Sequence, residues 1–195
     1  MRKFVAYTLA TGLTTVTLLA TVGCGDTQVA ASTPTNGDAV KRGEYLVSVV
    51  GCGDCHTPLK MGPQGPEPDM TRFLSGHPEQ VGTLPPAAAQ GPWLWAGAAT
   101  NTAFAGPWGT SYAANLTPDR NTGLGIWDEK MFVTAIRTGR HMGTSRPIMP
   151  PMPWPAFRNA SDEDLKAIYA YLKSLKPIAN HVPDLQPPAA PVATN

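Results

Sequence analysis

Apolar residues recur at helical spacing in three segments of the 195-residue chain. The clearest segment follows Ser161, and its apolar stripe consists of Leu165, Ile168, Tyr169, Leu172 and Leu175. Ser161 is placed to cap the start of this helix, and Pro177 to end it. The pattern therefore predicts an amphipathic helix packed on a core near the C-terminus.

Two further helices are predicted upstream. One begins at its N-cap Asp128 and ends at Gly139, with three apolar residues on one face. The other runs from about Asp38, its N-cap, to Val50. Gly43 lies inside this helix, where glycine costs about 1 kcal/mol relative to alanine. We therefore expect Gly43 to allow close packing by another helix.

Between these helices the periodicity is lost. Residues 61–115 are rich in glycine, proline and tryptophan, and neither helical nor strand spacing is sustained there. We expect a long irregular insert that covers part of the domain. Residues 24–37 are small and polar and indicate a flexible tether, while residues 181–195 indicate an extended, disordered Pro/Ala-rich tail. The predicted domain is therefore 38–180.

The N-terminus has the pattern of an export signal. Arg2 and Lys3 precede an uncharged run from residue 4 to residue 22. The run ends before Cys24 in a sequence similar to a lipobox, which predicts a signal peptide over 1–23 and lipidation of Cys24. An uncleaved membrane anchor and a soluble secreted protein are the alternatives. All three place the domain on the periplasmic side of a bacterial membrane.

Composition changes this picture little. The net charge is +1 and only 15% of residues are charged, so nothing favours a nucleic-acid partner. The chain has three cysteines, and if Cys24 carries lipid, the other two lie only three residues apart. That spacing calls for a chemical explanation other than a long-range disulfide.

The segment Cys52-Gly53-Asp54-Cys55-His56 supplies that explanation. Residues three and four apart share one face of a helical turn, so both thiols can form thioethers with one edge of a haem. The adjacent His56 then lies beneath the iron, which is the attachment pattern of c-type haem. One such motif predicts one covalent haem c. A zinc site, a thioredoxin-like redox pair and a chance match are the alternatives.

Iron bound by one histidine needs a sixth ligand or an open face. A methionine thioether raises the reduction potential of such a haem. Met131 lies on a predicted helix, and Met61 and Met70 lie in the irregular insert. The stretch "RPIMPPMPWP" remains, where stiff proline backbone can hold a sulfur atom in place. On the residues alone either Met149 or Met152 is the ligand, or both only fill apolar space.

Three stretches carry a family likeness: "GEYLVSVVGCGDCHTP", "NLTPDRNTGLGIWDEKMFVTAIRTGRH" and "PPMPWPAFRNASDEDLKAIYAYLKSLKP". Together they resemble class I cytochromes c, most closely the bacterial mono-haem, dehydrogenase-associated branch, over about residues 38–183. The resemblance implies a mainly α cytochrome c fold with three core helices around the haem. It also implies that Met152 is the iron ligand and that Pro58, or a carbonyl nearby, orients His56.

These observations predict an electron carrier and not an enzyme. His56 and Met152 fill both axial positions, and single electrons pass to redox partners such as a dehydrogenase, an oxidase or another cytochrome. The protein would be tethered to the membrane by its N-terminal lipid or anchor. The alternatives are a haem enzyme acting on peroxide or a nitrogen oxide, with His77 or His141 as acid–base group, and a gas or redox sensor.

Overall fold

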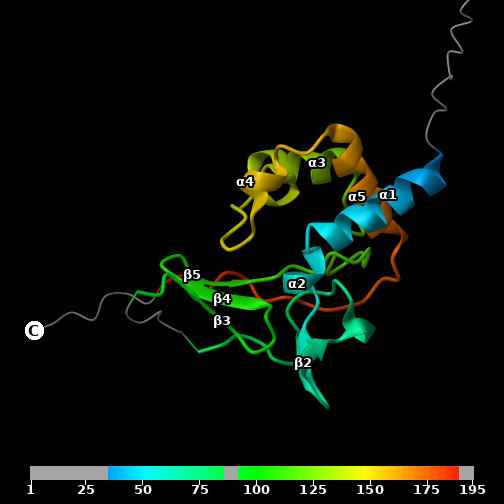
Figure 1. Cartoon of the computed structure of the whole chain (residues 1–195). Helices are drawn as coiled ribbons and strands as arrows, with labels where there is room; N and C mark the ends of the chain where they lie inside the picture. Colours follow the sequence, from blue (N-terminus) through cyan, green and yellow to red (C-terminus); the bar gives the residue numbers. More distant parts are fainter. Residues whose placement is uncertain (1–34, 86–91, 189–195) are drawn as a thin grey trace, which may run out of the picture. The chain divides into compact units, whose positions relative to one another are not determined.

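The computed structural model describes residues 35–85 and 92–188, which belong to one compact unit (Figure 1). The predicted signal peptide, Cys24 and most of the predicted tether lie outside the described residues, as do residues 189–195. Within the described ranges, no helix is both long enough and apolar enough to cross a bilayer.

Helix α1 (Asn36–Val49) has its N-cap three residues earlier than predicted. Thr35 is its N-cap, and its hydroxyl accepts a hydrogen bond from the Asp38 backbone N–H. The Asp38 carboxylate in turn accepts from the backbone N–H of Thr35, which completes a capping box. Asp38 is therefore the third residue of the helix and not its N-cap, and residues 36 and 37 belong to the helix and not to the tether.

Helices α3 (Glu129–Thr138) and α5 (Asp162–Ser174) confirm the predictions. The carboxylate of Asp128 caps α3, and the hydroxyl of Ser161 caps α5. Gly139 ends α3 with a φ of 67°, a left-handed conformation that favours glycine.

The closest helix contact joins α1 and α5 at Gly43. A Cβ atom at this position would overlap the backbone carbonyl of Ala167 and approach the Cβ of Tyr171 to 2.8 Å. The prediction that Gly43 allows close packing is therefore confirmed. The core beneath this crossing consists of Val47, Leu74, Leu124, Trp127, Phe132, Ala135, Ile136, Leu165 and Leu172.

The segment predicted to be irregular contains two small antiparallel sheets. In one sheet, β1 (Leu59–Gly62) pairs with β2 (Gly65–Pro68). The other has the order β3 (Ala96–Gly97), β4 (Ala103–Gly106) and β5 (Gly109–Tyr112). These strands have at most four residues each and are rich in Gly, Pro and Ala, so they carry no readable alternation of apolar and polar positions.

The tryptophans do not all form the packed cover that the sequence suggested. Trp93 is 74% exposed and Trp95 is 43% exposed, although the Trp95 ring packs edge-on against Phe104. Trp108 is half-buried and donates a hydrogen bond to the Ser111 hydroxyl. The packed part of the insert is therefore the face formed by β4 and β5.

The C-terminal segment after α5 is extended but is held in place. Asn180 is 4% exposed, and its side-chain amide donates to the backbone carbonyls of Ser75 and His77. Gln186 exchanges two backbone hydrogen bonds with Thr110 of β5. The disordered tail predicted from residue 181 is thus corrected for 181–188, whose partners are distant in sequence.

Four short helical turns complete the described residues. They are α2 (Cys52–His56), the 3₁₀ turns η1 (Met70–Arg72) and η2 (His141–Gly143), and α4 (Trp154–Phe157). The proline-rich stretch "RPIMPPMPWP" therefore leads into one helical turn, α4. Together α2 and the residues before α4 carry the predicted haem ligands.

Candidate haem site

Helix α2 presents the two cysteines on a single turn. Gly51 precedes it with a φ of 71°, where a Cβ atom would come within 2.7 Å of the Asp54 carboxylate. Cys52 and Cys55 are both partly buried, and both thiols are free. The left-handed turn at Gly51 thus starts a single helical turn that carries both cysteines and His56.

Both thiols are held in the protonated form. Burial raises the pKa of Cys52 to about 11, and the carboxylate of Asp54 adds to this shift. Burial also raises the pKa of Cys55, again with a contribution from Asp54. The thiols are therefore poor thiolate nucleophiles, which disfavours a thioredoxin-like redox role.

His56 is 8% exposed and fixed by one hydrogen bond. Its Nδ1 lies 2.7 Å from the backbone oxygen of Ala114, and a carbonyl only accepts, so Nδ1 carries the proton. Burial lowers the pKa of His56, against the opposing effect of this hydrogen bond. No described residue bonds Nε2, so the neutral ring keeps its Nε2 lone pair for a metal.

The carbonyl that orients His56 is thus not the one nearby in sequence. The Pro58 oxygen instead accepts a hydrogen bond of 2.8 Å from the backbone N–H of Asp69. Ala114 lies 58 residues after His56, at the end of the predicted insert. Sequence reasoning expected a local acceptor and had no signal for one so distant.

The backbone next to the His56–Ala114 contact is also hydrogen-bonded. The Gly76 N–H donates to the His56 oxygen at 2.8 Å, and the His77 N–H donates to the Ala113 oxygen at 2.9 Å. Gly76 has a φ of 79°, and a Cβ atom there would overlap the backbone of Ala113 and Ala114. Glycine is required at this point because two chain segments approach so closely.

His77 is a structural residue in this arrangement. Its side chain is fully buried, with Nδ1 2.9 Å from the Thr102 hydroxyl and Nε2 2.9 Å from the Gly82 oxygen. Because Gly82 can only accept, Nε2 carries the proton and Nδ1 accepts from Thr102. Both nitrogens are occupied, which disfavours the role of acid–base catalyst considered for His77.

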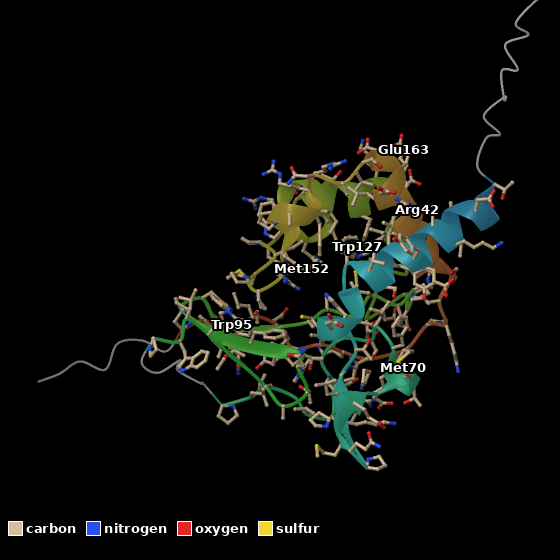
Figure 2. All side chains as sticks on the ribbon, viewed as in Figure 1. Arg42, Met70, Trp95, Trp127, Met152 and Glu163 are labelled. Carbon is tan, nitrogen blue, oxygen red and sulfur yellow. The ribbon has the colours of Figure 1, made fainter. Side chains whose placement is uncertain are left out.

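The methionines divide into exposed and packed groups. Met61 and Met70 are 78% and 64% exposed, which removes them as candidates for a buried ligand. Among the described residues, the half-buried side chains that pack against the core include Cys52, Met131, Met142 and Met152, but not Met149. Met152 is labelled in Figure 2, on the loop that leads into α4.

Met142 is a residue that the sequence did not single out. It lies in η2 with a φ of 53°, which is uncommon for a methionine. The preceding residue, His141, packs its ring edge-on against Trp127 of the core at a centroid distance of 4.9 Å. His141 is therefore part of the packing, and Met142 becomes a second candidate ligand from a loop.

The motif that begins at Asn115 is structural. The Asn115 carboxamide oxygen accepts from the backbone and the hydroxyl of Thr117, and its nitrogen donates to the Ile178 oxygen at 2.8 Å. Asp119 accepts hydrogen bonds from both the backbone and the hydroxyl of Thr122. These bonds fix the turn that leads to Trp127 and to the C-terminal segment.

The side chains fit a covalent haem better than a bare metal ion. Across 35–85 and 92–188, no group of three or more His, Cys, Asp or Glu residues is placed to hold a metal ion, which disfavours a zinc site. Two partly buried thiols and a neutral histidine with its Nδ1 engaged lie instead on one short helix, as the attachment motif of a c-type haem requires.

Comparisons with known proteins identify the family. Residues 40–176 match the family model for cytochrome c. The chain is 32% identical over 145 residues, or 74% of its length, to the gluconate 2-dehydrogenase cytochrome c subunit of Pantoea cypripedii. It is 29% identical over 182 residues, or 92% of its length, to the fructose dehydrogenase cytochrome subunit of Gluconobacter japonicus.

A shorter match, to a nicotinate dehydrogenase subunit from Pseudomonas putida, is 42% identical over 77 residues and covers 40% of the chain and 6% of that relative. The chain spans 25% and 30% of the gluconate and fructose dehydrogenase subunits. The family model covers most of the chain, and the relatives that match it most fully carry names of dehydrogenase cytochrome subunits. The chain therefore belongs to the cytochrome c family, as a class I c-type cytochrome similar to those associated with dehydrogenases.

Proposed function

We propose that this protein carries single electrons through one covalently attached haem c with His56 and Met152 as axial ligands. The observation that supports it most directly is the geometry of α2, where both thiols and a neutral His56 lie on one short helix. When bound, the haem supplies a one-electron ferric/ferrous couple. Cys52 and Cys55 would attach it, and the Ala114 carbonyl holds the His56 ring in one orientation.

The axial thioether would decide between a carrier and an enzyme. If Met152 binds the iron, its thioether would exclude substrate from the iron, and the neutral sulfur would favour the reduced state. The packing of Met152 on the core supports this choice over Met149. Both ring nitrogens of His77 are hydrogen-bonded, which disfavours His77 as the acid–base group of a haem enzyme, and the His141 ring packs edge-on against Trp127.

We further propose a dehydrogenase as electron donor. The relatives named above are cytochrome subunits of gluconate 2-dehydrogenase and fructose dehydrogenase, and each is three to four times longer than the segment shared with this chain. The present domain would therefore correspond to one haem-binding domain of such a subunit. Electrons would leave to an oxidase or another cytochrome.

The proposed location is the periplasmic side of a bacterial membrane, with Cys24 as lipid attachment site. The basic start, the uncharged run and the lipobox-like end of the signal segment support this. Mass spectrometry of the mature N-terminus tests it. A mature chain that begins at lipid-modified Cys24 supports the tether, and a chain that retains residues 1–23 supports an uncleaved anchor instead.

A spectroelectrochemical titration of the exported, haem-loaded protein tests the ligands. Met152→Ala is expected to remove the ferric thioether–iron absorption band and to lower the reduction potential, because a neutral soft ligand is lost. Met149→Ala and Met142→Leu are matched controls from the same and the neighbouring loop, and both should leave the band in place. If Met142→Leu removes the band and Met152→Ala does not, the ligand is Met142.

Carbon monoxide binding separates the carrier from the alternatives. A six-coordinate carrier binds it slowly, because Met152 must first leave the iron. Rapid binding by the reduced wild-type protein would contradict the carrier function and favour a sensor or an enzyme.

A further inference from the structure

One short segment contacts both sides of the proposed haem site. Ser111 in β5 donates a hydrogen bond of 2.5 Å from its hydroxyl to the backbone oxygen of Pro150. Ala114, three residues later, accepts the hydrogen bond of 2.7 Å from Nδ1 of His56. Pro150 belongs to the loop of Met152, so a single stretch of chain links the loop of one proposed ligand to the ring of the other.

This segment is well fixed. β5 pairs with β4 along its whole length. The Ala113 N–H donates to the Thr102 oxygen at 2.8 Å, and the Ala113 oxygen accepts from the His77 N–H at 2.9 Å. On its other edge, Thr110 exchanges two backbone hydrogen bonds with Gln186. The segment is therefore held from two sides before it contacts either ligand.

The Ser111 hydroxyl is specifically oriented toward Pro150. Ser111 is 8% exposed, and its one proton lies between the Pro150 oxygen at 2.5 Å and the Phe104 oxygen at 3.3 Å. The shorter contact takes the proton, because hydrogen-bond strength falls with distance. The indole N–H of Trp108 donates to the same hydroxyl at 3.2 Å and leaves its proton free for Pro150.

Holding the Pro150 carbonyl restricts the position of Met152. Pro151 has a fixed φ, so the direction of the chain between the two residues has little freedom. The Met152 N–H also donates to the Met149 oxygen at 3.3 Å, which closes the loop into a turn. A bond to the middle of this turn therefore limits how far the Met152 sulfur can move.

We propose that Ser111 is a positioning residue that holds the Met152 thioether in the axial position, and that β5 and Ala114 form a brace between the two ligand sides. The proposal rests on the axial ligands proposed above. It gives part of the insert, the segment from Ser111 to Ala114, the task of holding both proposed ligand side chains in place.

Imidazole affinity of the ferric, haem-loaded protein measures this directly, because imidazole must displace the thioether to bind iron. Ser111→Ala removes one hydrogen bond to the loop, and we expect imidazole to bind about tenfold more tightly. Ser145→Ala is the matched control. Its hydroxyl also donates to a backbone oxygen, that of His141 at 2.9 Å, but it is exposed and lies outside the turn of Met152. It should leave the affinity unchanged.

A double-mutant cycle distinguishes this inference from the ligand assignment. Met152→Ala alone should tighten imidazole binding more than Ser111→Ala does, and adding Ser111→Ala to it should produce no further change. If Met152→Ala has no effect, the ligand assignment fails. If Met152→Ala has its effect but Ser111→Ala has none, only the role of Ser111 fails. If Ser111→Ala changes imidazole affinity equally in wild type and in Met152→Ala, the role of Ser111 also fails, because its effect then does not depend on Met152.

Trp108→Phe provides a second variant if Ser111→Ala does not accumulate. It removes the N–H that orients the Ser111 hydroxyl and should shift imidazole affinity in the same direction by a smaller factor. Amide hydrogen exchange gives a readout that is independent of the iron. The Met152 amide should exchange faster in Ser111→Ala than in wild type, while the amides of α5 should not change. Unchanged exchange at Met152 would overturn the brace.

Discussion

The helical frame of α1, α3 and α5 and the insert between residues 61 and 115 are built by different interactions. The frame forms from local signals: a capping box at Thr35, N-caps at Asp128 and Ser161, and apolar stripes at helical spacing. The insert forms from contacts between residues far apart in the chain, such as the hydrogen bond that Nδ1 of His77 accepts from the Thr102 hydroxyl.

The difference separates stability from ligand placement. The frame supplies six of the nine residues of the described apolar core, and Leu74, Leu124 and Trp127 supply the other three. The described insert residues supply the carbonyl on His56 and the hydroxyl on the loop of Met152, the two hydrogen bonds that bear on the proposed ligands. Changes in the frame should therefore alter the free energy of unfolding most, and changes in the insert should alter the site at a smaller cost in stability.

The largest effect is expected at the frame crossing. Gly43→Ala places a methyl group against the Ala167 carbonyl, which belongs to backbone and cannot rotate away. The helices must separate, at a cost of about 3 kcal/mol in the free energy of unfolding. Urea denaturation of the haem-loaded protein measures it.

Gly37→Ala is the matched control in the same helix. A Cβ atom there meets only the Thr35 hydroxyl oxygen at 3.7 Å, an ordinary contact. Alanine should therefore stabilise the protein by about 0.5 kcal/mol, through the lower backbone entropy of the unfolded chain. If both variants lose stability equally, the close crossing is not what makes Gly43 necessary.

These two kinds of construction also explain what the sequence could predict. Ser161 and Asp128 act on amide groups three residues away, so a short window of sequence contains the whole signal. The attachment motif at Cys52 is equally local. The start of α1 was misplaced because Thr35 lies within a segment whose composition suggested a tether.

The carbonyl that accepts the hydrogen bond from His56 could not be predicted from a short window of sequence. Ala114 acts through its backbone oxygen, and any residue type carries one, so no side chain marks it. Its partner lies 58 residues away, and the register of β4 and β5 that places it depends on tertiary pairing. Ser111 and Met142 were missed for the same reason, since their roles depend on which segments meet in the fold.

The second largest effect is expected where the C-terminal segment binds the insert. Asn180→Ala removes two donors to the Ser75 and His77 oxygens and the acceptor of the Glu79 N–H. Leaving these buried groups unpaired should cost about 2–3 kcal/mol. The rate of amide hydrogen exchange should increase at His77 more than in α5. Such a difference would show that the insert opens while the frame stays folded.

Asn159→Ala is the control for this loss. Asn159 is exposed, and its amide makes one long hydrogen bond of 3.3 Å to the Pro155 oxygen. Stability should stay within about 0.5 kcal/mol of wild type. Uniform acceleration of exchange across the frame and insert in Asn180→Ala would contradict the separation of the two regions.

A smaller effect should appear as a pH dependence of stability. Burial lowers the pKa of His77 below its ordinary value of 6.5, against the hydrogen bond to the Gly82 oxygen. The unfolded state then binds more protons than the folded state, so stability is complete above pH 6.5 and falls as the pH decreases below it. The slope for one histidine cannot exceed about 1.4 kcal/mol per pH unit.

His77→Gln removes this titration while keeping an amide that can donate to Gly82 and accept from Thr102. The variant should be less stable than wild type at pH 8, and the difference should narrow as the pH falls toward 5. Urea denaturation at a series of pH values measures it. A constant difference across that range would show that the neutral state of His77 contributes nothing to the insert.

The smallest effect is expected at the exposed edge of the insert, which distinguishes its packed face from its outer face. Trp93 is 74% exposed, so Trp93→Ser should change the free energy of unfolding by less than about 0.5 kcal/mol. Trp95 is 43% exposed and packs edge-on on Phe104 at a centroid distance of 5.7 Å, so Trp95→Ser should cost about 1 kcal/mol. Thermal unfolding of both variants checks the order. An equal and large loss would mean that the outer tryptophans belong to the stabilising core, and the contrast between a stabilising frame and a positioning insert would no longer hold.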